Sequence, residues 1–204
     1  MVINYKPLNS VLADDTYPIP HKGDLLGRIV GAKLFSKFDL KSGFWQVAVA
    51  EKDKFKTAFS IPVGNYKWNV MPFGLKHAPS KFQKVMDTIF KPYAEWLLAY
   101  IDDLLIFSRN LQDHFRHLKI FMKLVKRNGL VLRKKKMELC RTKIKFLGHN
   151  IEDGQIALQQ HSMEFADKFP DVILDKTQLQ RFLGCLNYVR NFYDGCAIDR
   201  SLLN

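Results

Sequence analysis

The sequence is poor in cysteine, with three in 204 residues and no pair in the C-x-x-C spacing. Cys140, Cys185 and Cys196 therefore predict neither a disulfide framework nor a zinc site, and a reducing intracellular environment is the simplest interpretation. No apolar run approaches the ~20 residues that a membrane-spanning helix needs, and the start of the chain lacks the apolar core of a signal peptide. These absences favour a cytosolic or nuclear location.

Acidic residues are scarce relative to basic ones. The 20 Asp and Glu face 32 Lys and Arg, so the formal net charge is +12 and the sequence pI is about 9.6. Such an excess indicates a polyanionic partner, nucleic acid or an acidic membrane surface, although a merely soluble basic protein has the same charge. A hydrophobic fraction of 47% with 16 Phe excludes a disordered chain, and the length suits one large domain or two small subdomains.

Two adjacent aspartates, Asp102 and Asp103, interrupt the apolar stretch LLAYIDDLLIFS at residues 97–108. The pattern predicts two buried strands joined by a tight turn. Neighbouring carboxylates are costly in such a setting unless each charge stays solvated or paired. Two interpretations remain open, because Asp is a common turn residue and paired carboxylates are also oxygen ligands suited to Mg²⁺ or Mn²⁺.

Periodicity along the rest of the chain predicts an α+β fold with a mostly antiparallel sheet. Helices are expected at 24–32, 78–90, 110–129 and 175–193. Strands are expected at 33–40, 45–50, 56–62, 66–71, 130–133, 144–149 and 155–158.

The helix at 110–129 has the clearest signals, since Asn110 suits its N-cap and Gly129 its end. Apolar residues at 3–4 spacing predict its buried face, which comprises Leu111, Phe115, Leu118, Met122 and Val125. His114 and His117 have the spacing of a metal-binding pair. Without a nearby Cys they are expected to lie on a solvated face of this basic helix.

A third carboxylate, Asp39, lies at the end of an expected strand, just before a glycine-containing turn. Strand alternation directs Phe38 and Leu40 to the core and Asp39 to the opposite face. A single Asp of this kind is usually a solvated strand residue, but a sheet could place it next to Asp102 and Asp103. Three carboxylates that hold two metal ions are the arrangement that nucleotidyl transfer requires.

Five blocks occur in order along the chain: FDLKSGFWQV, MPFGLKHAPSKFQ, YIDDLLIFS, NGLVLRKKK and FLGH. They resemble the reverse transcriptases of gypsy-type retroelements and of the plant pararetroviruses of the caulimovirus family. The segment DKTQLQRFLGCLNYVRNFY extends the likeness into the thumb and connection, so that it covers nearly the whole chain, to about Tyr193. The resemblance implies a right-hand polymerase, with partial fingers and palm at 1–150 and a thumb or start of a connection at 151–204.

The resemblance also implies a role for each matching residue. Asp39, Asp102 and Asp103 match the palm ligands of two Mg²⁺ ions, for which Mn²⁺ could substitute. Phe44 matches the aromatic residue that stacks under the incoming sugar and excludes a 2′-hydroxyl, although a core aromatic is the alternative. Matches to contacts with the incoming nucleotide and the template are Phe73, Gly74, Pro79, Ser80 and Gln83.

Two further blocks have competing interpretations. FLGH matches the turn that holds the primer end, formed by Phe146, Leu147, Gly148 and His149, and a plain β-hairpin competes with that role. Within RKKK at 133–136, Lys136 matches the lysine proposed to protonate the leaving pyrophosphate. A shift of one residue would give this role to Lys135, and such a run is also typical of a solvated basic face.

These matches predict an RNA-directed DNA polymerase that extends a primer with dNTPs on an RNA or DNA template, in the cytoplasm or in a virus-like particle. Members of this branch have further fingers residues, including a Lys and an Arg that bind the triphosphate, without a counterpart in this sequence. The rival prediction is therefore a truncated, reverse-transcriptase-like remnant that binds nucleic acid with weak or no activity. No membrane partner is expected.

Overall fold

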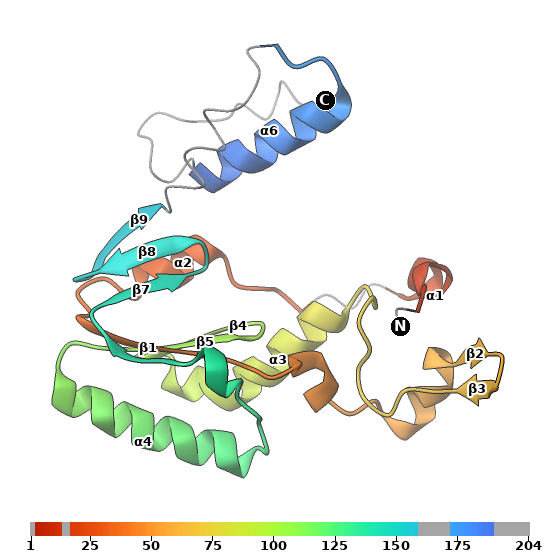
Figure 1. Cartoon of the computed structure of the whole chain (residues 1–204), viewed down its shortest axis with the longest axis horizontal. Coiled ribbons are helices and arrows are strands. Elements are labelled where there is room, and N and C mark those ends of the chain that lie inside the picture. Colours follow the sequence, from red (N-terminus) through yellow and green to blue (C-terminus); the bar gives the residue numbers. More distant parts are fainter. Residues whose placement is uncertain (1–2, 14–16, 159–171, 190–204) are drawn as a thin grey trace.

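A four-stranded antiparallel sheet lies at the centre of the computed structural model, which describes residues 3–13, 17–158 and 172–189 (Figure 1). In spatial order its strands are β4 (Leu97–Tyr100), β5 (Asp103–Ser108), β1 (Leu34–Asp39) and β6 (Glu138–Arg141). Two smaller antiparallel sheets accompany it: the hairpin β2 (Phe59–Ile61) and β3 (Gly64–Tyr66), and the meander β7 (Lys143–Phe146), β8 (His149–Glu152) and β9 (Gln155–Leu158).

Five α-helices belong to the described residues: α1 (Lys6–Val11), α2 (Lys22–Gly27), α3 (Ala78–Phe90), α4 (Leu111–Arg127) and α6 (Lys176–Val189). Short 3₁₀ helices form at Gly43–Gln46, Glu51–Thr57, Lys91–Tyr93 and Lys134–Lys136. None of these helices is both long and apolar enough to span a membrane.

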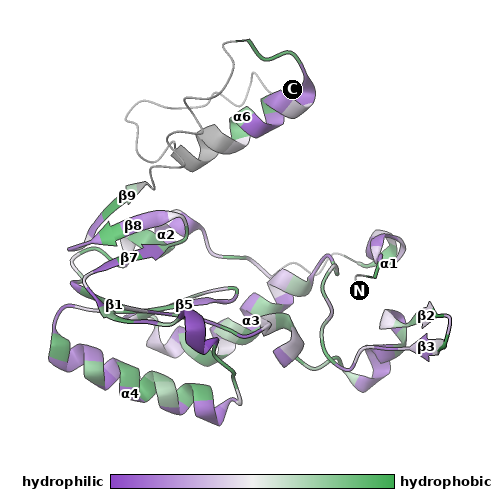
Figure 2. Cartoon of the chain, viewed as in Figure 1, coloured by the Kyte–Doolittle hydropathy of each residue, from purple (hydrophilic) through white to green (hydrophobic). Residues whose placement is uncertain are grey.

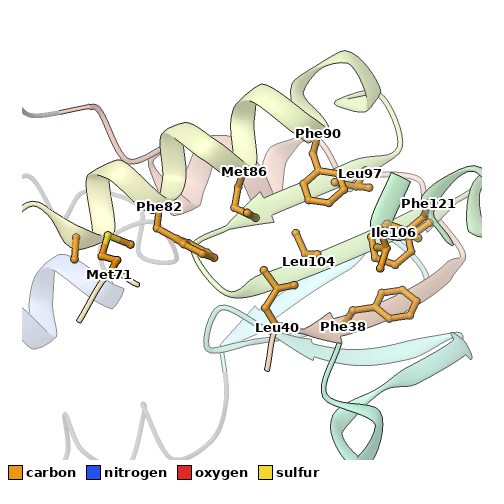
Figure 3. Packing of buried hydrophobic residues seen from close by; sticks show 12 residues of the cluster. Phe38, Leu40, Met71, Phe82, Met86, Phe90, Leu97, Leu104, Ile106 and Phe121 are labelled. Atoms are coloured by element: carbon orange, nitrogen blue, oxygen red, sulfur yellow. The ribbon is translucent and has the colours of Figure 1, made fainter. Parts of the chain in front are cut away.

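Helices α3 and α4 pack on one face of the central sheet (Figures 1 and 3). Side chains from both helices meet those of β1, β4 and β5 in one cluster, formed by Phe38, Leu40, Phe82, Met86, Phe90, Leu97, Leu104, Ile106, Phe121 and Val125. Phe121 of α4 joins the two helices to the sheet, since its ring contacts both Phe38 and Phe90. This packing fixes both helices against the strands that carry the aspartates.

The opposite face of the sheet is covered by α2 and the β7–β9 meander. The second cluster comprises Leu25, Leu26, Ile29, Phe35, Leu98, Leu105, Phe107, Ile144, Phe146 and Ile151. Because β5 is buried on both faces, its side chains need not alternate between apolar and polar, which accounts for the continuous apolar run in the sequence.

The meander approaches the α2–β1 connection more closely than side chains would permit. Gly154, in the β8–β9 turn, lies so near Gly31 that a Cβ built on it would lie 2.7 Å from the Gly31 backbone nitrogen. Both glycines have positive φ, +81° for Gly31 and +75° for Gly154. The meander is thus fixed to the rest of the structure by a direct backbone contact.

Several predicted elements are confirmed. Helix 78–90 is α3 with the same bounds, and the aspartate hairpin is β4–β5. The Asn110 side chain caps α4 by accepting a 2.8 Å hydrogen bond from the Asp113 N–H, and Gly129 has a φ of +64° just beyond the helix. Helix 175–193 corresponds to α6 as far as Val189, whereas residues 190–193 and Cys196 lie outside the described residues.

Three predicted strands are wrong. Residues 66–71 share only Tyr66 with β3, and beyond it they make a single isolated bridge at Val70. Residues 45–50 begin in a 3₁₀ helix and then make a single bridge, Ala48 to Val70. Residues 130–133 also make one bridge only, Leu132 to Leu40, and then enter the 3₁₀ helix at 134–136. Apolar side chains of the latter two segments, including Val47, Leu130 and Leu132, pack against the core cluster, but these two segments form no strand ladder.

The predicted buried face of α4 is also wrong in part. Leu111, Phe115 and Met122 are about half exposed. The buried positions are His114, His117, Phe121 and Val125, so the face that α4 presents to the sheet includes its two histidines. Figure 2 shows hydrophobic and hydrophilic residues mixed along this helix.

The two histidines are satisfied by serines of the sheet, which corrects the expectation of a solvated face. His114 lies 2.8 Å from the Ser36 hydroxyl and 3.0 Å from that of Ser108, and His117 lies 2.8 Å from Ser108. The His117 ring also stacks on Trp96. Burial lowers the pKa of both imidazoles, because the charged form would lose its hydration.

Candidate active site

The strand register brings the three predicted carboxylates to one end of the sheet. Asp39 ends β1 and lies directly opposite Asp103, which begins β5. Asp102 occupies the β4–β5 turn after Ile101, whose φ is +51°. The Leu40 N–H donates a 3.0 Å hydrogen bond to the Asp102 carbonyl oxygen, so the turn is tied to the end of β1.

Gln83 of α3 is hydrogen-bonded to the backbone of the β4–β5 turn. Its side chain is fully buried, and its Oε1 accepts a 2.8 Å hydrogen bond from the Ile101 N–H. Its Nε2 donates to the Ala99 carbonyl at 3.0 Å and to Asp87 Oδ1 at 2.8 Å. The structure gives Gln83 a positioning role, and its predicted contact with the template remains a prediction.

Burial and mutual repulsion act on the aspartate pair. The pKa of Asp102 rises from an ordinary value of 3.8 to about 6, first because of burial and then because of the charges of Asp39 and Asp103. Burial, followed by the Asp39 charge, also raises the pKa of Asp103. Asp102 Oδ1 is buried and accepts no hydrogen bond from any described residue.

Asp39 is compensated by two cations from the segment that follows α4. Lys136 Nζ lies 3.3 Å from Asp39 Oδ2, and Arg133 Nε lies 3.2 Å from Asp39 Oδ1. Lys135 has no such contact with Asp39 in the described structure, so the geometry favours Lys136 for the predicted proton donor. Within the described ranges, no three acidic, His or Cys side chains are gathered closely enough to hold a metal ion as they stand.

The residues nevertheless fit a divalent cation. The carboxylates supply the hard oxygen ligands that Mg²⁺ and Mn²⁺ prefer. Such a cation would bind the buried Asp102 oxygen that lacks a donor, and it would offset the crowded negative charge that contributes to the raised pKa of Asp102. The Asp39 carboxylate would have to release one of its present cationic partners to join Asp102 and Asp103 in holding the cation.

Gly43 gives the Asp102 carboxylate the space that it occupies. A Cβ on Gly43 would overlap Asp102 Oδ1 and lie 2.8 Å from Cζ of Phe82. Gly43 begins the 3₁₀ helix 43–46 that also carries Phe44. A side chain at this position would therefore displace either the aspartate or the helix.

Phe44 belongs to a series of aromatic contacts beside the carboxylates. Its ring packs edge-on against Phe82 at 5.3 Å and lies 5.4 Å from Phe73. Phe73 is 48% exposed, whereas Phe44 is partly buried. Gly74 follows with a φ of +93°, a conformation that favours glycine. Phe73 is thus open to a ligand, and the roles predicted for Phe44, Phe73 and Gly74 remain predictions.

The FLGH block forms the β7–β8 hairpin, with positive φ at both turn residues, Leu147 and Gly148. Phe146 and His149 are buried in it, and His149 Nδ1 lies 3.0 Å from the Leu147 carbonyl. Only the turn residues are partly exposed, so a primer could contact Leu147 and Gly148 more readily than Phe146 or His149. The primer role is untested.

Sequence reasoning missed Arg133, Gly43 and the positioning role of Gln83. Arg133 is the first residue of RKKK, which is typical of a solvated basic face. Its contact with Asp39 depends on the chain returning to the end of β1 after α4. The glycine in SGFWQ was visible, but no sequence signal indicated that a carboxylate fills the space beside it.

Antiparallel strands that place Asp39 opposite Asp103, packed against two helices and beside a cationic segment, are the arrangement expected of a polymerase palm. The family described as "Reverse transcriptase (RNA-dependent DNA polymerase)" matches residues 1–151. The chain belongs to this family, and the predicted relationship to the pararetrovirus enzymes is confirmed.

The curated relatives are viral polyproteins. The chain is 46% identical over 203 residues to the "Enzymatic polyprotein" of Cauliflower mosaic virus (strain Strasbourg), covering 100% of this chain and 30% of the relative. It is 50% identical over 192 residues to the "Genome polyprotein" of Petunia vein clearing virus (isolate Shepherd), covering 94% of this chain and 9% of that polyprotein. The chain therefore spans 30% or less of the length of these relatives.

A solved structure confirms the fold. The foamy viral protease-reverse transcriptase dRH, solved in complex with double-stranded DNA, has a TM-score of 0.81 to this chain at 26% identity. The match covers 96% of this chain and 34% of that one. The predicted α+β polymerase fold, with its mostly antiparallel sheet, is thus confirmed.

Proposed function

We propose that this chain is the catalytic part of an RNA-directed DNA polymerase, which transfers nucleotides from dNTPs to a primer 3′-hydroxyl. The observation that carries the proposal is the strand register that brings Asp39, Asp102 and Asp103 together while Asp102 Oδ1 remains without a donor among the described residues. Membership of the reverse transcriptase family and the +12 charge support it.

Asp39, Asp102 and Asp103 would hold two Mg²⁺ ions, with Mn²⁺ as a substitute. The bound ions would activate the primer hydroxyl and neutralise the leaving pyrophosphate. The primer 3′-hydroxyl would lose its proton to solvent, its oxygen would bond to the α-phosphorus, and the bond from that phosphorus to the bridging oxygen would break. Lys136, whose ammonium already lies at the carboxylates, would donate a proton to the pyrophosphate.

The residues around the carboxylates would position the substrates. Phe44 would lie under the incoming sugar and exclude a 2′-hydroxyl, while Phe73 and Gly74 would contact the incoming nucleotide. An RNA or DNA template with its primer would bind through backbone phosphates and the positive charge of the chain, with the Leu147–Gly148 turn near the primer end. In this proposal residues 1–150 form partial fingers and palm, residues 151–204 begin the thumb, and the reaction occurs in the cytoplasm or in a virus-like particle.

Primer extension on RNA and DNA templates tests the proposal, with wild type compared with Asp39→Asn. The variant should bind template–primer normally and lose extension, because it keeps its shape but loses a metal ligand. Asp153→Asn, which removes an exposed carboxylate in the β8–β9 turn, is the matched control. Near-normal extension by Asp39→Asn would refute the proposal, and binding without extension by wild type would favour the rival remnant.

A further inference from the structure

Asp39 is the carboxylate of the site that already has cationic partners. Its side chain is only 17% exposed, and it lies between Arg133 Nε at 3.2 Å and Lys136 Nζ at 3.3 Å. The Arg133 contact is an ion pair without hydrogen-bond geometry, so Oδ1 of Asp39, like Oδ1 of Asp102, is buried without a hydrogen-bond donor among the described residues. Arg133 is therefore close enough to Asp39 to offset its charge, but it does not satisfy the buried Asp39 oxygen as a hydrogen-bond donor would.

The segment carrying these cations is fixed to the end of β1 by main-chain bonds. The Lys41 N–H donates to the Val131 carbonyl at 2.8 Å, and the Arg133 N–H donates to the Asp39 carbonyl at 2.8 Å. Gln46 joins the two segments, since its Nε2 donates to Lys41 and Val131 carbonyls at 2.7 and 3.0 Å and its Oε1 accepts from the Val131 N–H at 2.9 Å. The backbone can thus stay in place while the Arg133 side chain moves.

We infer that the Arg133 guanidinium competes with a divalent cation for the Asp39 carboxylate, and that metal binding displaces it. This inference rests on the proposed function, because it requires Asp39 to be a metal ligand. Arg133 is not needed to donate a proton, a role for which Lys136 is placed. Instead, Arg133 offsets the charge of Asp39 when no metal ion is bound. This compensation limits the repulsion among the three neighbouring carboxylates.

An exchange of this kind is physically easy. The Arg133 side chain is 41% exposed, so its ion pair is screened by water and contributes little binding energy of its own. The guanidinium can return to solvent when a cation of higher charge density arrives. The positive charge of Arg133 also lowers the pKa of Asp102, so its field reaches beyond Asp39.

The test is the affinity of the whole chain for Mn²⁺ at pH 7.5, measured by electron paramagnetic resonance of free Mn²⁺. Arg133→Gln should bind Mn²⁺ roughly three- to tenfold more tightly than wild type, because the competing ion pair is gone. Arg133→Lys, which keeps the charge, should stay near the wild-type affinity. Arg116→Gln is the matched control, since Arg116 is exposed and pairs at 3.1 Å with Asp113 on α4. It should change the affinity by less than about twofold.

Thermal melting in EDTA shows whether each variant is folded before its affinity is compared. An affinity of Arg133→Gln equal to that of Arg116→Gln, or weaker than that of wild type, would overturn the inference, since Arg133 would then not compete with the metal. A different result would show that the proposed function itself is wrong: wild type would not bind Mn²⁺, or Asp39→Asn would leave Mn²⁺ binding unchanged. In that case the inference about Arg133 would be wrong as well.

Discussion

Replacing Asp102 by Asn should make the protein more stable in the absence of metal ions. Burial and the neighbouring aspartates raise the pKa of Asp102 from 3.8 to about 6, so the ionised carboxylate is less stable in the folded protein than in the unfolded chain. Below pH 3.8 the group is protonated in both states and there is no cost. The cost grows as the pH rises from 3.8 to about 6 and is complete above about 6.

The magnitude follows from the pKa change. A rise from 3.8 to about 6 corresponds to roughly 3 kcal/mol at pH 8, at ~1.36 kcal/mol per pH unit. Because the side chain is only half-buried, solvent screening reduces this figure to about 1 kcal/mol. For a chain of 204 residues this corresponds to a rise in Tm of about 2–4 °C.

The assay is thermal unfolding of wild type and Asp102→Asn in EDTA, at pH 8 and at pH 4.5. The gain should be complete at pH 8 and should shrink to about a third at pH 4.5, because that pH lies only a little above 3.8. Added Mg²⁺ should stabilise wild type more than the variant. Asp153→Asn controls for the loss of one negative charge elsewhere on a basic chain. A variant no more stable than wild type at pH 8, or one whose gain is independent of pH, would refute this account of the site.

Three further changes have expected outcomes. Gly43→Ala should lower primer extension at least tenfold and destabilise the fold by about 1–3 kcal/mol, because its Cβ would overlap the Asp102 carboxylate. Gly27→Ala is the control and should leave extension unchanged, because no described atom lies within 4 Å of its Cβ. Phe44→Val should admit ribonucleotides, which a comparison of ribonucleotide and deoxynucleotide incorporation measures; an unchanged ratio would assign Phe44 to the core. In urea unfolding, the free energy of unfolding should fall as the pH drops below 6.5, because burial lowers the pKa of His114 and His117 in the folded protein and the unfolded chain binds protons first. His114→Gln should reduce this pH dependence; an unchanged dependence would indicate that His114 lies on a solvated face.

The elements predicted best are those whose signals are local. Pro79 near the start of α3, the Asn110 cap of α4 and the apolar runs around Asp102 each specify structure within a few residues. The pairing of Asp39 with Asp103 needed the resemblance to a family, because strand alternation alone does not state which strands are neighbours.

The failures have a common physical cause, which is contact between segments far apart in the chain. His114 and His117 recur with Phe121 and Val125 at helical spacing, but a pattern based on hydrophobicity counts them as polar and selects Leu111 instead. The serines of β1 and β5, together with Trp96 stacked on His117, make them suitable for burial. The Arg133–Asp39 ion pair likewise joins residues that no local pattern relates.

The approach of Gly154 to Gly31 has a consequence for how this domain can diverge. Gly154 excludes a side chain, because its Cβ would meet the Gly31 backbone, so a replacement there would separate the meander from the α2–β1 connection. At Gly31 a Cβ would meet nothing within 4 Å, and only its backbone angle favours glycine. Neither glycine is near the carboxylates. In a saturation library selected for folding alone, Gly154 should tolerate almost no replacement, whereas Gly31 should be limited by its backbone angle alone. No side-chain change at Gly31 should rescue a replacement at Gly154, since the obstacle at Gly154 is the Gly31 backbone.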